Sequence, residues 1–446
     1  MTDFFDQPLT RENTCSVKFD ARRAVFGRED VIPVWVADMD FAAPEAVTQA
    51  LSERAAHPVY GYTLFPDSLF QSIMDWFRER HGWDIQRKWI LMAPGVVPSL
   101  HAACMAYAAP GEGVIVQPPV YPPFFSSVQL SGRVVIENPL VCDNETGEYR
   151  MDLEHLEACA ARPDARLLML CSPHNPVGRI WSEQELKAVL DIARRHELTV
   201  ISDEVHCDLT FTDKPRHRML ATLAGRDDAL ITAVAPSKCF NMPGLGLSAL
   251  VIPDREQRNA MKAVFDSMHQ PQCNPFSIAG FEAGYRYGAP WLDDLMAYLQ
   301  KNRDFVVETV NARLPGIRTS APEGTYLMWL DCRNLGMNDA ALVSRAVVSC
   351  GSTSAAPRRY WPMCCSVLKR HCQPSGRLLV NYRTVVVDKF PARRLVHPRH
   401  ISVGFFDGFP HLAAVEGHFA LLVSLGPKPL FWTFAKARSV FTGCAG

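Results

Sequence analysis

Between about residues 90 and 290 the sequence repeats one alternation, in which a short and almost wholly apolar run is followed by a segment with helical periodicity. The runs lie at 90–92, 113–117, 133–136, 166–171, 198–202, 229–234 and 247–252. Strands that are apolar on both faces need cover on both faces, and alternation with helices supplies it. The pattern therefore predicts an α/β fold with a mainly parallel, doubly covered sheet. In such sheets ligands bind outside the carboxyl ends of the strands.

The helical segments carry recognisable start signals. Ser182 and Glu185 form a capping box, and Leu186 and Val189 begin an apolar stripe behind it. A second helix is expected to begin with Asp67 as its cap. Further helices are expected at about 45–51, 98–107, 291–314 and 339–348, and residues 324–331 are expected to form a strand that opens a smaller α+β domain.

The 446 residues, with 48% apolar and 21% charged content, suffice for one large α/β domain and a smaller companion. We expect an N-terminal arm and small-domain segment at 1–45, a large domain at 46–288, the start of a small domain at 289–348 and an atypical tail at 349–446. The net charge of −1 argues against nucleic acid or an anionic membrane as partner.

Targeting and redox features are also absent from the sequence pattern. Residues 1–6 include two acids and lack the pattern of a signal peptide, and no apolar run reaches the length of a membrane span. The 14 cysteines include no CxxC pair and no zinc-type spacing. We therefore expect a cytoplasmic protein with reduced thiols and no metal site.

Lys238 follows the apolar run at 229–234 and stands in a loop rich in proline and glycine, 235–246. Burial lowers the pKa of a lysine, and a neutral amine can attack a carbonyl to form a Schiff base. An ordinary surface charge is the alternative at such a position, so the remaining strand ends decide between the two.

Two polar residues end neighbouring runs. Asp203 could hold a pyridinium nitrogen protonated, which makes the ring an electron sink, or it could cap a helix. Asn175 offers an amide donor suited to a phenolate oxygen, or it could be a turn asparagine.

Two further loops have a possible use of the same kind. Gly95, Val96 and Val97 precede a helix, so their backbone N–H groups could receive a phosphate, although a plain tight turn would look the same. Tyr121 stands among prolines, where its ring could stack on a ligand or simply pack.

Together, and in this order, these motifs resemble the fold-type I pyridoxal-phosphate enzymes of the class I/II aminotransferase superfamily. The closer resemblance is to the cystathionine β-lyase, or cysteine C–S lyase, branch. It extends over about residues 1–348 and rests on 34–41, 60–62, 172–179, 201–209, 235–247 and 324–331.

The resemblance implies pyridoxal 5′-phosphate as cofactor, with Lys238 as the Schiff-base lysine. It implies that Asp203 contacts the pyridine nitrogen and Asn175 the ring oxygen, while Tyr121 stacks on the ring. Lys238 would also act as general base on the Cα proton of the substrate.

The same resemblance places Val96, Val97 and Ser237 on the cofactor phosphate. Tyr62 would reach the phosphate of a partner subunit, which implies a homodimer with shared active sites. His206 stands where ordinary aminotransferases carry a tyrosine to the ring oxygen, and a core histidine is the alternative.

Two departures favour the lyase branch. Ala235 and Gly246 stand where aspartate-aminotransferase-like enzymes would place a phosphate-binding serine and arginine, and Trp35 with the run 37–39 also resembles the lyases. The expected reaction is α,β-elimination of a sulfur amino acid to pyruvate, ammonia and a thiol. A class I/II aminotransferase, or an impaired cofactor-binding or regulatory relative, remains the alternative.

The resemblance stops where the charge changes. Residues 349–446 hold 13 basic and 3 acidic residues, against 33 and 44 in the rest of the chain. Leu379 occupies the position where the family has an arginine for the substrate carboxylate, and Arg377 or Arg383 could substitute. A shifted reading frame near residue 349 is our hypothesis, and a divergent tail with its own role is the alternative.

Overall fold

The computed structural model describes residues 2–7, 9–26, 29, 33, 36–270 and 274–335, together with the backbone of 379–381 and 384–386. The helix expected at 339–348, the residues Trp35, Arg377 and Arg383, and nearly all of the basic tail lie outside this part. Within it, no helix combines the length and the apolar character needed to cross a membrane.

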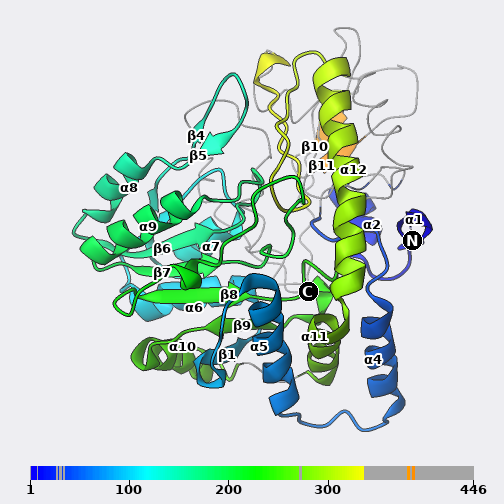
Figure 1. The fold of residues 1–446 in the computed structure, drawn as a ribbon, viewed down its shortest axis with the longest axis horizontal. Helices are drawn as coiled ribbons and strands as arrows, with labels where there is room; N and C mark the ends of the chain where they lie inside the picture. The colour runs from blue at the N-terminus through cyan, green and yellow to red at the C-terminus, as the bar shows by residue number, and fades with distance from the viewer. Residues whose placement is uncertain are drawn as a thin grey trace, which may run out of the picture.

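A seven-stranded sheet forms the centre of the described chain, with strand order β1-β9-β8-β7-β6-β2-β3 (Figure 1). Its strands are β1 (Ile90–Ala93), β2 (Gly113–Val116), β3 (Val134–Glu137), β6 (Ala165–Cys171), β7 (Thr199–Asp203), β8 (Leu230–Val234) and β9 (Ser248–Val251). Neighbouring strands from β3 to β8 run parallel, whereas β9 is antiparallel to both β8 and β1. The expected mainly parallel sheet is thus confirmed, with one antiparallel strand.

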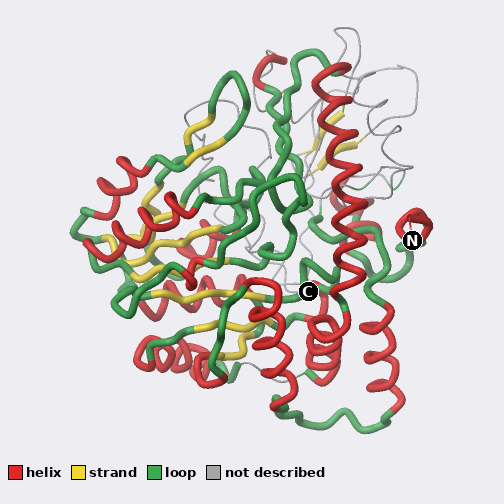
Figure 2. The backbone as a smooth tube through the Cα atoms, in the orientation of Figure 1, coloured by secondary structure: helices red, strands yellow, loops and turns green. Residues whose placement is uncertain are grey.

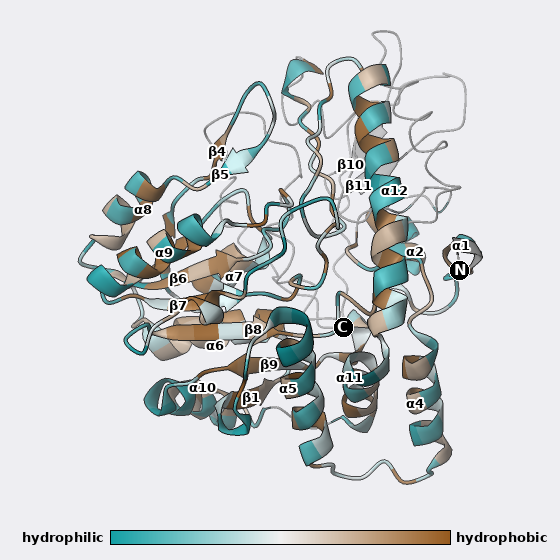
Figure 3. Cartoon of the chain, in the orientation of Figure 1, coloured by the Kyte–Doolittle hydropathy of each residue, from teal (hydrophilic) through white to brown (hydrophobic). Residues whose placement is uncertain are grey.

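The sheet is covered on both faces because alternate residues of each strand enter different apolar clusters. In β2, Val114 and Val116 pack with α6 (Val96–Tyr107) and α7 (Pro123–Leu130), whereas Ile115 packs with α8 (Leu153–Ala160) and α9 (Glu183–Arg195). Figure 3 shows the result, with apolar strands inside and helices that are polar on their outer sides.

Figure 2 shows the remaining helices, some of which lie against the sheet and others beyond its edge. They are α1 (Thr2–Asp6), α2 (Val17–Asp20), α3 (Arg22–Phe26), α4 (Glu45–Ala56), α5 (Asp67–His81), α10 (Arg255–Ser267), α11 (Pro275–Tyr287) and the long α12 (Ala289–Arg313). Two short antiparallel pairs lie outside the main sheet: β4 (Val141–Cys142) with β5 (Tyr149–Arg150), and β10 (Leu379–Asn381) with β11 (Thr384–Val386).

The sequence predicted one helix start correctly and one incorrectly. The predicted capping box at Ser182 and Glu185 is present at the start of α9. The residue before α5 is Pro66, and the side chain of Asp67 makes no capping hydrogen bond, so the prediction of Asp67 as a cap was wrong.

The strand expected at 324–331 was also wrong. This segment makes only isolated bridges within the described residues, from Gly324 to Thr210 and from Asp331 to Arg318. Its apolar run satisfies the composition of a strand, but a strand also needs a continuous neighbour for its backbone groups.

Candidate functional site

The register of the sheet brings the predicted loops to one edge. Cys171 pairs with Asp203, and Asp203 pairs with Ala233. On the other side, Val234 pairs with Ala249 of β9, and Ala93, the last residue of β1, pairs with Ser248. Adjacent strands lie about 4.8 Å apart, so the loops that follow β6, β7 and β8 begin side by side. The loop after β1 begins at the same edge, separated from that of β8 by β9.

Lys238 is partly buried beyond the end of β8. Its Nζ donates to the backbone oxygen of Ala37 at 3.2 Å. Burial lowers the pKa of this amine, while the carboxylates of Asp203 and Asp38 act in the opposite direction. A lysine with a lowered pKa has more of the neutral form that can attack a carbonyl.

Asp203 ends β7 and is buried. Burial raises the pKa of its carboxyl to about 7, against the opposing effects of the Val205 N–H and the Lys238 charge. The Val205 N–H, at 3.2 Å, is the one hydrogen bond that this carboxylate receives among the described residues. A buried carboxylate with so few partners is suited to a cationic ligand atom.

His206 is also buried, three residues further along the chain. Burial and the nearby Lys238 charge lower its pKa to about 3, so the ring is neutral. Its Nδ1 atom has no hydrogen-bond partner among the described residues, and its ring contacts Tyr326 edge to face at 5.8 Å between centroids.

The loops after β2 and β6 meet directly, because the backbone N–H of Tyr121 donates to the oxygen of Asn175 at 3.1 Å. Burial, helped by the Asp203 charge, raises the pKa of Tyr121 to about 12, so its hydroxyl stays protonated. The Asn175 side chain is nearly buried and makes no hydrogen bond among the described residues, which leaves its amide available.

The turn after β1, where a phosphate is expected to bind, leads directly into helix α6. Gly95 precedes the helix with φ of 158°, a conformation that other residues rarely adopt. Val96 and Val97 follow as the first helical residues, and N–H groups of a first turn have no partner inside their helix.

These residues fit the cofactor that the sequence suggests. The unpartnered Nδ1 of His206, the sparsely bonded carboxylate of Asp203 and the free amide of Asn175 are polar groups that need a ligand on the same edge of the sheet. Lys238 lies within electrostatic reach of both Asp203 and His206.

The two remaining predicted residues differ in exposure. Ser237 is partly buried next to Lys238, and its backbone oxygen accepts from the N–H of Met242 at 3.0 Å. Tyr62 stands fully exposed in the loop between α4 and α5, and no described contact joins it to the other predicted residues.

Sequence reasoning missed the residues that surround the lysine from distant parts of the chain. The hydroxyl of Tyr326 donates to Ala37 O at 2.8 Å, so it shares this acceptor with Lys238. Asn241 contacts the same segment through its side chain. The motifs at 34–41, 235–247 and 324–331 contained these residues but gave no indication that they meet.

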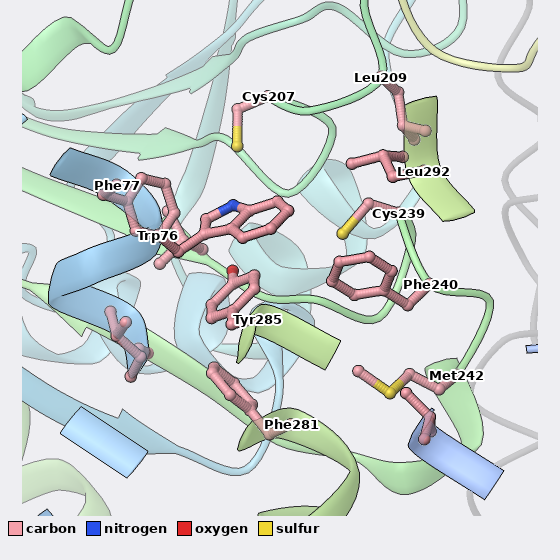
Figure 4. Packing of buried hydrophobic residues seen from close by; sticks show 14 of the residues in the cluster. Trp76, Phe77, Cys207, Leu209, Cys239, Phe240, Met242, Phe281, Tyr285 and Leu292 are labelled. Carbon is pink, nitrogen blue, oxygen red and sulfur yellow. The ribbon is translucent and has the colours of Figure 1, made fainter. Parts of the chain in front are cut away.

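A buried carboxylate anchors the loop that follows Asp203 and carries His206. Asp208 accepts hydrogen bonds from Trp76 Nε1 at 3.2 Å and from His81 Nε2 at 2.9 Å, both on α5. Figure 4 shows the buried apolar side chains near Trp76, whose indole stacks on the ring of Tyr285 with 5.0 Å between the ring centroids. The loop after β7 is thereby fixed to helix α5, which lies more than 120 residues earlier in the chain.

Comparison with known proteins gives a consistent set of relatives. A family model described as aminotransferase class I and II matches residues 29–355. Cystathionine beta-lyase PatB of Bacillus subtilis is 40% identical over 342 residues, which cover 76% of this chain and 88% of the relative. Protein MalY of Escherichia coli is 32% identical over 342 residues, which cover 76% and 86% of the two chains.

Solved structures are similar over the same part. A PLP-bound putative aminotransferase from Clostridium difficile matches with a TM-score of 0.78 and 34% identity, and covers 83% of this chain and 99% of that one. Cystalysin from Treponema denticola, with its pyridoxal 5′-phosphate cofactor, matches with a TM-score of 0.75 and 30% identity, over 83% and 96% of the two chains.

Proposed function

Because the chain belongs to the class I and II aminotransferase family, we infer that it is a pyridoxal-phosphate-dependent carbon–sulfur lyase. The observation that carries this inference is that a partly buried lysine, Lys238, follows β8 while a buried carboxylate, Asp203, ends the adjacent strand β7, and that each affects the pKa of the other. The 40% identity to a cystathionine beta-lyase over most of the chain selects elimination over the other reactions of the family.

Lys238 and Asp203 would carry the chemical roles in this reaction. Lys238 would hold the cofactor covalently and, once released, would take the Cα proton of the substrate as general base. Bound pyridoxal 5′-phosphate supplies an electron sink for the negative charge that develops at Cα. Asp203 would keep the pyridine nitrogen protonated, and its burial makes it sensitive to that cation.

The remaining residues orient the cofactor. Asn175 and His206 would contact its ring oxygen, and Tyr121 would lie against its ring. The helix N-terminus at Val96 and Val97, with Ser237, would receive the phosphate, because first-turn N–H groups and the helix dipole both favour an anion.

The substrate is a sulfur-containing amino acid, and loss of a thiol from Cβ leaves pyruvate and ammonia. Purified protein should show the visible absorbance of a protonated Schiff base and release pyruvate from cystathionine or cysteine. Lys238→Ala should abolish both, whereas Lys88→Ala, which removes an exposed lysine, should change neither. Amino transfer that depends on a keto acid, without pyruvate release, would instead support an aminotransferase.

We propose a cytoplasmic homodimer with shared active sites. Four large apolar side chains of the loop between α4 and α5 are exposed, which is expensive unless another surface covers them: Val59, Tyr60, Tyr62 and Leu64. In the dimer Tyr62 would reach the cofactor phosphate of the partner subunit. Sedimentation at several concentrations tests the assembly, and a monomer that retains full activity would contradict it.

We propose a shifted reading frame near residue 349, which one coincidence supports. The family match ends at residue 355, close to the charge change at residue 349. A second, independent reading of the gene across codons 340–360 tests it, and an uninterrupted frame would contradict it. A substrate arginine lost in this way would impair turnover while cofactor binding persists.

A further inference from the structure

The backbone oxygen of Ala37 is the acceptor for two groups of the site. It receives the Lys238 amine at 3.2 Å and the Tyr326 hydroxyl at 2.8 Å. Ala37 opens a segment, residues 37–41, that has no helix or strand of its own. Because such a segment lacks the restraint of backbone hydrogen bonds within an element, side chains must hold it in place.

On one side the segment is held by the lysine's own loop. Asn241, three residues after Lys238, accepts from Met39 N at 2.8 Å and donates to the oxygens of Met39 and Phe41 at 2.9 and 2.8 Å. These three hydrogen bonds tie residues 37–41 to the loop that contains Lys238, whose amine donates to Ala37 O.

On the other side the segment is held by the N-terminal arm, residues 9–26. Arg11 reaches Asp38 and Asp40, with 2.7 Å to each carboxylate. Lys18 is fully buried, and its Nζ lies 3.0 Å from both carboxylate oxygens of Asp40 and 3.0 Å from the backbone oxygen of Asp38. Two cations and two carboxylates thus neutralise one another directly beside Ala37.

We propose that Arg11 and Lys18 are positioning residues for Lys238, acting through Asp38 and Asp40 to hold the Ala37 oxygen against the lysine amine. This proposal rests on the proposed function only in taking Lys238 as the residue that carries the cofactor. The proposal gives the N-terminal arm a role in positioning Lys238, although Arg11 and Lys18 lie more than 200 residues before it in the sequence.

The arm also sets the charge that the lysine experiences. The groups that face Lys238 are the carboxylates of Asp203 and Asp38 and the neutral ring of His206, with the protonated hydroxyl of Tyr326 on the same acceptor. Of these, Asp203 and, to a smaller extent, Asp38 raise the pKa of Lys238. Arg11 offsets the charge of Asp38, so the two residues have opposite effects on the amine.

The test uses the full chain without cofactor, so that it does not depend on activity. Lys238 is labelled with an amine-reactive reagent over a range of pH, and mass spectrometry of its peptide gives the midpoint of its titration. Hydrogen exchange at the Met39 amide reports whether the segment is held. The variants are Asp38→Asn and Arg11→Gln. Arg22→Gln is the matched control, because it removes a guanidinium of the same arm that pairs with Glu12 instead.

Asp38→Asn should lower the labelling midpoint of Lys238 by about one pH unit, and Arg11→Gln should raise it. Both should speed exchange at Met39 by about tenfold or more, since hydrogen bonds to charged groups stabilise by that much. Arg22→Gln should change neither. A general loosening of the fold would move both midpoints in the same direction.

Midpoints that do not move, that move in the same direction, or an unchanged Met39 exchange rate would overturn the proposal. If Asp38→Asn does not fold, Arg11→Gln against Arg22→Gln still decides it. Failure of the proposed function would show separately, as a wild-type protein that develops no Schiff-base absorbance with pyridoxal 5′-phosphate while its Lys238 still titrates normally.

Discussion

Replacing Asp203 by asparagine should stabilise the cofactor-free protein at neutral and higher pH, although it should abolish catalysis. Burial raises the pKa of Asp203 from 3.8 to about 7 in the folded chain. Between these values the folded protein binds more protons than the unfolded one, so the free energy of unfolding of the wild type falls as pH rises. Asparagine has the same shape and carries no charge, so the variant avoids this loss.

The size of the effect follows from the same shift. A difference of about 3 pH units corresponds to about 4 kcal/mol once the carboxyl is fully ionised. Most of it should appear between about pH 4 and about pH 7, the two pKa values of the carboxyl, and it should be absent well below the pKa of the unfolded chain. Asparagine keeps an oxygen for the Val205 N–H, so no hydrogen bond is lost to offset the gain.

The assay is denaturant unfolding of the dialysed protein at a series of pH values. Asp191→Asn serves as control, because this α9 side chain is 56% exposed and its loss should change stability by less than about 0.5 kcal/mol. Added cofactor should reverse the order and favour the wild type, since only a carboxylate can pair with a protonated pyridine. An asparagine variant that is less stable at pH 8, or a difference that does not vary with pH, would refute the reasoning.

Three other predictions concern the frame around the site. Asp208→Asn should lower the free energy of unfolding by about 3–5 kcal/mol, because it breaks the buried pair with His81, and denaturant titration measures this. Gly178→Ala should cost about 1–3 kcal/mol, seen as a lower Tm, since φ is +73° and a Cβ would lie 2.3 Å from the side chain of Pro322; an unchanged Tm would contradict it. Tyr62→Ala should leave the fold intact, as the side chain is fully exposed, but weaken cofactor binding in a spectroscopic titration, and equal affinity would count against a shared site.

The sheet was predictable because its strands are apolar on both faces, a composition that few other structures require. The same reasoning placed Asp203 at the end of one strand and Lys238 in the loop after another, and the structure shows that these two strands, β7 and β8, are neighbours in the sheet. Their partners could not be found in this way. Ala37 and Asn241 contribute a backbone oxygen and a side-chain amide from about 200 residues apart, and such contacts leave no local pattern in a sequence.

The two wrong predictions have a common cause. Asp67 has the residue type of a cap and 324–331 has the composition of a strand, but both need a partner that composition does not reveal. A capping side chain must belong to the residue just before the first helical turn, and in α5 that residue is Pro66. The strand needs a neighbouring chain, and within the described residues that segment meets only isolated bridges.

The position of β9 in the sheet has a consequence for the order in which the protein assembles. Among the described strands, β1 pairs with β9 alone, and β9 begins more than 150 residues later, at Ser248. During synthesis β1 and the Gly95 turn behind it must therefore wait until β9 has left the ribosome. The strands from β2 to β8 can pair earlier, because the chain folds from its N-terminus as it emerges. The Gly95 turn thus takes its final place only after the chain has been made as far as β9, later than the ends of the strands from β2 to β8.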